Sequence, residues 1–246
     1  MDLTIPFLLV GVFLTSTLSG ALGMGGGMLL MGCFLHLLPV PVAMTLHGLT
    51  QLAANGFRAA LLRDQIRSRV LLPYLAGALL AGILARSVGH VPGPGAVLLV
   101  LGSLPFLAPF LPRTLRLRED DPRSALSCGL SVGLLHLTAG VSGPVLDLYF
   151  LGSPLTRKQV VATKAATQTL AHGAKLGYFA LALEGSHPVL APSVLSLVWL
   201  SAFLGTLLGR RILASMSEDS FRGAGNLLVR LAGIVYLTRG ILLFRG

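Results

Sequence analysis

Charged residues are scarce in this chain. Only 11% of its 246 residues are Asp, Glu, Lys or Arg, whereas soluble domains carry roughly 25%. Hydrophobic residues make up 54%, and the mean hydropathy is +0.81. Several apolar runs approach the ~20 residues that a helix needs to cross a bilayer, and the longest polar stretch, 113–124, is too short to fold alone. The composition excludes a large soluble domain and indicates a membrane protein.

Cysteine is nearly absent as well. Cys33 and Cys128 lie inside apolar runs and form no C-x-x-C motif, so we expect buried small side chains rather than a disulfide. The same argument gives no expectation of a metal ion or another cofactor. No basic residue precedes the first apolar run, and a cleaved signal peptide is therefore not expected.

Acidic residues are rarer than basic ones, 9 against 19, which gives a net charge of +10. A basic protein can bind nucleic acid, but here the basic residues form short clusters between apolar runs, as topology signals of membrane proteins do. We therefore expect membrane lipid, and no nucleic acid, as a partner. The clusters are Arg63/Arg67/Arg69, Arg113/Arg116/Arg118/Arg123, Arg157/Lys158 and Arg210/Arg211/Arg222.

The chain repeats one pattern at an interval of 117 residues. Gly-Met-Gly-Gly-Gly at 23–27 returns as Gly-Val-Ser-Gly-Pro at 140–144. The polar stretch that follows returns without a gap, since Thr50-Gln51 corresponds to Thr167-Gln168. A duplicated unit with a broken apolar segment and a polar helix is how many membrane transporters build a central substrate site.

The apolar runs predict an all-α, polytopic membrane protein of two repeats. Each repeat has a broken or re-entrant helical segment followed by three transmembrane helices, because a lipid-exposed span must satisfy its own backbone. The runs 125–139 and 144–152 are each too short to span alone. The predicted organisation is a first membrane repeat at 1–112, a cytoplasmic linker at 113–124 and a second membrane repeat at 125–246.

Two layouts compete for these repeats. If each broken segment is a single kinked span, the halves run parallel; if each is a helical hairpin, the halves are inverted. The inverted layout places all four basic clusters on one side, the cytoplasm, in agreement with the positive-inside rule. It also places Arg239 and Arg245 outside, against that rule. We favour the inverted layout and keep the parallel one as the alternative.

Two stripes of polar residues follow the glycine clusters. His47, Gln51, Asn55 and Arg58 are spaced i, i+4, i+8 and i+11, so they fall within an arc of roughly 80° on one helix face. Polar groups at membrane depth usually face an interior cavity, and we expect the stripes to line a substrate site. Arg58 and Lys175 could instead lie near helix ends and extend to the interface. The second stripe is Lys164, Gln168, His172 and Lys175, and Thr50 and Thr167 flank the two.

The glycine clusters predict two helix starts that face one anion. A helix start exposes free N–H groups and the positive end of the helix dipole. Glycine lets an anion approach the backbone because it has no Cβ. The residues expected to bind substrate here are Gly25, Gly26, Gly27, Ser142 and Gly143. The glycines at 77, 82, 205 and 209 are instead expected to permit close packing of helices.

Asp147 is the only acid inside an apolar run. It could carry a coupling proton, or it could pair structurally with Lys164 or Lys175. Both interpretations stay open.

At these residues the sequence resembles the sulfite exporter TauE/SafE family. The family's two glycine motifs correspond to 23–27 and 140–144, and its "ATxx" motif to Ala162-Thr163. The segment 205–222 is similar to the family's penultimate helix and loop. Ser142 and His47 depart from the family pattern. The resemblance implies transport of sulfur-containing anions, such as sulfite or organosulfonates, across the inner (plasma) membrane.

We therefore expect a multi-pass secondary transporter, not an enzyme, that moves a small anion by alternating access. The sequence leaves a homodimer open. One alternative is an intramembrane serine protease with Ser142 as nucleophile and His172 as base. Another is a passive anion channel.

Overall fold

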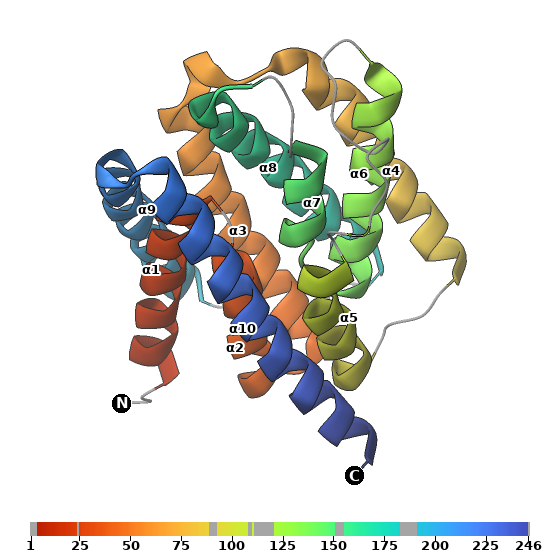
Figure 1. Ribbon diagram of the computed structural model, residues 1–246. Coiled ribbons are helices and arrows are strands. Elements are labelled where there is room, and N and C mark those ends of the chain that lie inside the picture. Colours follow the sequence, from red (N-terminus) through yellow and green to blue (C-terminus); the bar gives the residue numbers. More distant parts are fainter. Residues whose placement is uncertain are drawn as a thin grey trace.

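The computed structural model describes residues 4–23, 25–88, 93–107, 110, 121–150, 155–182 and 191–245. The described residues are almost entirely helical and contain no β-strand, which confirms the all-α prediction. Figure 1 shows the helices packed side by side in one bundle. They are α1 (Thr4–Leu22), α2 (Gly26–Leu37), α3 (Val40–Leu61), α4 (Leu71–Val88), α5 (Pro94–Leu107), α6 (Pro122–Thr138), α7 (Gly143–Phe150), α8 (Arg157–Ala182), α9 (Pro192–Ser215) and α10 (Glu218–Arg245), with short 3₁₀ turns at Arg63–Gln65 and Ser68–Val70.

Each glycine cluster breaks a helical segment at a turn. The backbone of Gly23 has φ 66°, and that of its counterpart Gly140 has φ 77°. These are left-handed conformations that residues with a Cβ rarely adopt. The chain therefore leaves α1 and α6 at corresponding positions of the repeat, and the short helices α2 and α7 follow.

The start of α6 differs from the prediction. The apolar pattern begins at 125, but the helix begins at Pro122. Asp121 caps it, since its carboxylate accepts a hydrogen bond from the backbone N–H of Arg123 at 3.0 Å. Pro122 fits the first helical position because its missing N–H has no intrahelical partner to lose. The polar cap and the proline extend the helix into the segment assigned to the linker.

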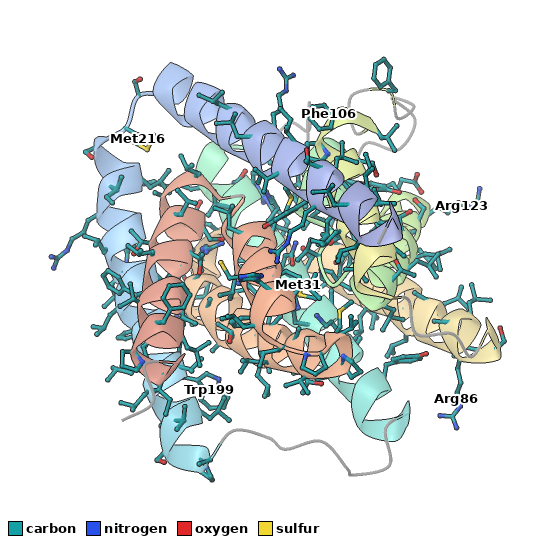
Figure 2. The ribbon with its side chains drawn as sticks, turned by 90° about the horizontal axis from the view of Figure 1, so that it is seen from below. Met31, Arg86, Phe106, Arg123, Trp199 and Met216 are labelled. Carbon is teal, nitrogen blue, oxygen red and sulfur yellow. The ribbon has the colours of Figure 1, made fainter. Side chains whose placement is uncertain are left out.

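Among the residues that the structure describes, three helices are long and apolar enough to cross a bilayer: the spans Ile5–Leu22, Ser68–Ser87 and Pro192–Ser215. Large apolar side chains on the outer faces of α4 and α10 are exposed. Figure 2 views the bundle from below, with Met31 near its centre and Arg86 and Trp199 toward its edge. An apolar exterior of this kind is the one that lipid solvates, and the chain is a multi-pass membrane protein.

Helix pairing is symmetric with respect to the sequence repeat. The most extensive contacts join α1 with α9, α4 with α6, α3 with α8, and α5 with α10. Replacing each helix by its counterpart in the other copy (α1 by α6, α3 by α8, α4 by α9, α5 by α10) reproduces the same four pairs. In Figure 1, α1 and α3 run upward from the end that carries both termini, whereas α6 and α8 run downward.

Glycines bring several of these pairs into close contact. A Cβ at Gly77 would lie 2.1 Å from the carbonyl oxygen of Leu126, and a Cβ at Gly209 would lie 2.3 Å from that of Thr17. Gly205 is equally close to the backbone of α1. Close packing is therefore confirmed at these three positions. The expectation is wrong for Gly82, because a Cβ there would lie no closer than 3.9 Å to its nearest neighbour, Cδ2 of Tyr178.

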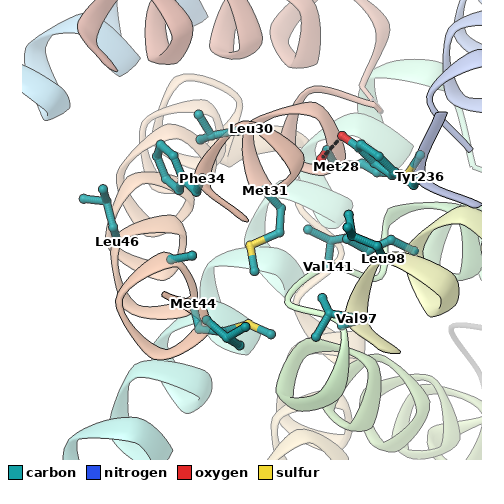
Figure 3. Packing of buried hydrophobic residues seen from close by; sticks show 14 of the residues in the cluster. Met28, Leu30, Met31, Phe34, Met44, Leu46, Val97, Leu98, Val141 and Tyr236 are labelled. Carbon is teal, nitrogen blue, oxygen red and sulfur yellow. Dashed lines mark hydrogen bonds between the residues drawn. The ribbon is translucent and has the colours of Figure 1, made fainter. Parts of the chain in front are cut away.

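The short helix α2 lies in the main apolar core. Figure 3 shows Leu30, Met31 and Phe34 packed among residues of α3 and α5 and beside Val141. The Tyr236 hydroxyl donates a hydrogen bond of 2.8 Å to the carbonyl oxygen of Met28. These contacts hold the first turn of α2 at a fixed position inside the bundle.

We predict that Gly26→Ala destabilises the fold. A Cβ at Gly26 would lie 2.1 Å from the carbonyl oxygen of Thr15 and 2.7 Å from the Cβ of Ser19. Hence α1 and α2 must separate, at a cost of about 1–3 kcal/mol. Thermal unfolding of the detergent-purified protein measures the effect. Gly11→Ala, whose added Cβ meets nothing within 4 Å, should leave the midpoint unchanged; equal midpoints for the two variants would contradict the packing argument.

Candidate functional site

A polar cavity of about 50 Å³ lies between α3, α8 and the two glycine turns. One water molecule needs roughly 10–15 Å³ on this measure, so the cavity has room for a small polyatomic ion. Most of the predicted stripe and glycine residues meet here. Its walls contain Gly25, Gly27, His47, Gln51, Asn55, Arg58, Ser142, Gly143, Lys164, Gln168 and His172, and also Ser19, Gly23, Met28, His136, Val141 and Ala165.

The α3 side of the cavity is a connected polar network. Asn55 donates from Nδ2 to Gln51 Oε1 at 3.1 Å, and its Oδ1 accepts from Arg58 Nη1 at 3.4 Å. All three side chains are buried. Because the Gln51 oxygen is engaged by Asn55, its amide nitrogen remains as the donor of that side chain.

Three nitrogen atoms of this network have no hydrogen-bond partner: Arg58 Nε, Arg58 Nη2 and Gln51 Nε2. The Arg58 side chain is only 6% exposed, and no carboxylate pairs with it among the described residues. Leaving a buried cation and buried donors unpaired costs several kcal/mol. An oxyanion satisfies all of them, because it supplies both negative charge and acceptor oxygens.

The α8 side of the cavity adds a second cation. Lys164 donates from Nζ to the carbonyl oxygen of Gly23 at 2.9 Å, which ties α8 to the first glycine turn. The α2 helix starts beside it with Gly25 as N-cap, and no side chain caps its first N–H groups. At a helix start these N–H groups have no acceptor within the helix. The positive charge of Lys164 and the positive end of the α2 dipole therefore both favour an anion here.

Three buried histidines form the inner end of the cavity. The rings of His136 and His172 stack with centroids 4.4 Å apart, and those of His47 and His172 meet edge to face at 5.4 Å. His47 Nε2 donates to the carbonyl oxygen of Gly27 at 2.8 Å, because a carbonyl can only accept. Sequence reasoning missed His136. It stands alone in an apolar run, and its only signal was its place just before the second glycine turn.

Some predicted site residues lie elsewhere. The hydroxyls of Thr50 and Thr167 donate to carbonyls of their own helices, at 2.9 Å and 3.0 Å, and do not line the cavity. Gly26 packs against α1. Lys175 is buried and lies beyond His47, outside this cavity. Asp147 belongs to α7, but its side chain lies outside the described residues.

The Ser142 hydroxyl pairs with His136 Nε2 at 2.9 Å, not with His172 as the protease hypothesis requires. Within the described part of the chain, no group of His, Cys, Asp or Glu side chains could hold a metal ion. The donors and cations on its walls suit the binding of an anion.

Comparison with known proteins gives one family. The family described as "Sulfite exporter TauE/SafE" matches residues 7–236, nearly the whole chain, which confirms the resemblance carried by the glycine motifs. No curated protein and no solved structure matches this chain.

Proposed function

Because the chain belongs to the sulfite exporter TauE/SafE family of membrane transporters, we propose that it is a secondary transporter of a small sulfur-containing anion. The substrate is sulfite or a small organosulfonate, and the membrane is the inner membrane. The protein carries out no covalent chemistry on this substrate.

The observation that carries the proposal is the buried guanidinium of Arg58, whose Nε and Nη2 have no hydrogen-bond partner, beside the unpartnered Nε2 of Gln51. Sulfite and sulfonate groups present three oxygens, each of which accepts hydrogen bonds from such donors. A cavity of about 50 Å³ suits a compact ion better than a bulky one. The choice of sulfur comes from the family, whereas the preference for a small oxyanion comes from the site.

Alternating access in this proposal is a movement of one inverted repeat against the other. The symmetric helix pairing and the opposite directions of α1 and α6 support an inverted arrangement. So does the position of the basic connections: the α3–α4 connection and the start of α8 lie at the upper end of Figure 1, opposite the two termini. The positive-inside rule makes that end cytoplasmic. The substrate site lies between α3 and α8, where the two repeats meet, as in other repeat-built transporters.

Transport in proteoliposomes tests the function. Purified protein should take up radiolabelled sulfite, and an imposed proton gradient should drive accumulation above the external concentration. Uptake that only ever reaches the external concentration would favour a passive channel. The absence of any sulfite flux above that of empty liposomes would contradict the proposal.

We also predict that Gly143→Ala weakens anion binding without changing stability. A Cβ at Gly143 would meet nothing within 4 Å, and Gly143 lines the cavity, so we expect the added methyl group to enter it. An added methyl group fills part of a volume of about 50 Å³ and removes room for the ion. Calorimetric titration with sulfite measures the affinity, and Gly11→Ala serves as a matched methyl addition away from the cavity. Equal affinities in both variants would show that the ion does not occupy this space.

A further inference from the structure

A second cavity lies between α4, α6 and α8, with one residue of α3, and it has a volume of about 680 Å³. In contrast to the first cavity, its walls are almost entirely apolar. They include Leu75, Leu79, Ile83, Leu170, Ala174 and Tyr178. Leu79 and Ile83 are exposed, so this cavity is open along the outer face of α4. The cations on its walls are Lys175, which is buried, and Arg86, which is exposed near the end of α4.

The two cavities follow one another along α8. The first is lined by Lys164, Ala165, Gln168 and His172, whereas the second is lined by residues from Thr169 to Tyr178. The first therefore lies toward the helix start with its basic Lys158, and the second toward the opposite end of the bundle. His136 lines both cavities, so its side chain forms part of the wall between them.

A chain of hydrogen bonds crosses this wall. Lys175 donates from Nζ to His47 Nδ1 at 3.4 Å and to the carbonyl oxygen of Gly140 at 3.2 Å. The other nitrogen of His47 donates to the carbonyl oxygen of Gly27 at 2.8 Å. The chain thus links the two broken segments, Gly27 in the first copy and Gly140 in the second, through one ammonium group and one imidazole.

An anion can readily replace the present hydrogen-bond acceptors of Lys175. The ammonium is 1% exposed, and both of its hydrogen-bond acceptors are neutral and at long distance. An anion adds the attraction between opposite charges, which is stronger in a buried site than in water, to the hydrogen bonds that a neutral acceptor already makes with the ammonium. An oxyanion that reaches the wall therefore competes well for Lys175 against His47 and Gly140.

We propose that Lys175 and His47 form the gate between the two cavities, and that Lys175 is a second anion-binding position on its far side. The anion leaves the Arg58 cavity, replaces the neutral acceptors of Lys175 and passes into the apolar cavity. Because contact of an unsolvated ion with apolar walls is costly, the ion crosses the second cavity hydrated and is not retained there. This inference rests on the proposed transport function, but its test does not require transport.

Cysteine accessibility tests the gate. The native cysteines are replaced (Cys33→Ala, Cys128→Ala), and Ser19→Cys serves as a reporter because Ser19 lines the first cavity. A membrane-impermeant methanethiosulfonate that carries a sulfonate is added from the face opposite the basic connections. Ala174→Cys, in the second cavity, reports whether the reagent reaches the far side of the gate.

We expect Lys175→Met to raise the rate of modification at the Ser19→Cys reporter by about tenfold, since two hydrogen bonds that close the wall are lost. Loss of a cation alone would slow an anionic reagent, so a faster rate reports opening. His47→Leu removes the imidazole that accepts from Lys175 and leaves Lys175 in place, so it should raise the rate as well. This variant tests the gate if Lys175→Met does not fold. Lys158→Met, at an exposed lysine of the same helix, is the matched control.

Unchanged rates at this reporter in the folded gate variants would overturn the proposal. So would an unreactive Ala174→Cys reporter, because the second cavity would then not open to that face. Sulfite binding is measured separately, as the difference in affinity between the wild type and Arg58→Gln. If the gate variants do not raise the modification rate but the wild type binds sulfite, only this inference is contradicted. If the gate variants raise the rate but the wild type does not bind sulfite, the proposed substrate is contradicted.

Discussion

Arg58→Gln should raise the dissociation constant for sulfite by about 10- to 100-fold, because each hydrogen bond to a charged group contributes about 1.5–3 kcal/mol. The wild-type guanidinium is buried, with Nε and Nη2 unpartnered. Glutamine keeps an amide that can bond Asn55 but removes the positive charge. Isothermal titration of the purified protein with sulfite measures the change.

The same variant separates a binding role from a structural one. Removing an uncompensated buried cation should leave the ligand-free protein as stable as the wild type, or more stable. A structural arginine would instead lower the melting temperature when replaced. Arg63→Gln changes an arginine that is 82% exposed and paired with Asp64, and it should alter neither property. Unchanged sulfite affinity in Arg58→Gln would remove Arg58 from the site.

Gln51→Glu is expected to have the second large effect: it should weaken sulfite binding and stabilise the ligand-free protein. The side chain accepts a hydrogen bond from Asn55, and its Nε2 has no partner. A carboxylate of the same shape keeps the bond from Asn55 and supplies a counter-charge for the Arg58 network. It also repels an incoming anion, and because like charges in contact cost several kcal/mol, sulfite affinity should fall by more than about 100-fold.

Thermal unfolding without ligand should show a higher melting temperature for Gln51→Glu than for the wild type. Gln159→Glu makes the same change near the start of α8, outside both cavities, and controls for the added charge. If Gln51→Glu binds sulfite as the wild type does, the amide of Gln51 does not face the ligand.

The polar stripe of α3 could be predicted because its period is that of a helix. His47, Gln51, Asn55 and Arg58 recur at helical spacing in a run that is otherwise apolar, and all four line the cavity. The glycine turns were equally visible, since Gly23 and Gly140 recur at the same position of a repeat and both adopt positive φ. Local period and duplication are properties of the sequence itself.

The roles of individual polar residues inside the bundle could not be predicted in the same way. Thr50 and Thr167 flank the stripes, but a threonine hydroxyl in a helix can bond the carbonyl one turn back, as both do. Lys175 continues its stripe by spacing, yet packing of α8 against α4 and α6 places it on a second cavity. His136 gave no periodic signal, because its neighbours in α6 are apolar or small. Each of these outcomes depends on which helix lies opposite, which one sequence does not state.

The central claim is that a small oxyanion binds beside Arg58 and Gln51, between α3 and α8. Anomalous diffraction from crystals soaked in selenite, the selenium analogue of sulfite, tests it most directly. The account predicts a selenium peak within hydrogen-bonding reach of the Arg58 guanidinium and the Gln51 amide, and no such peak in crystals of Arg58→Gln. A peak that lies only outside this cavity, or a peak that persists unchanged in the variant, would contradict it.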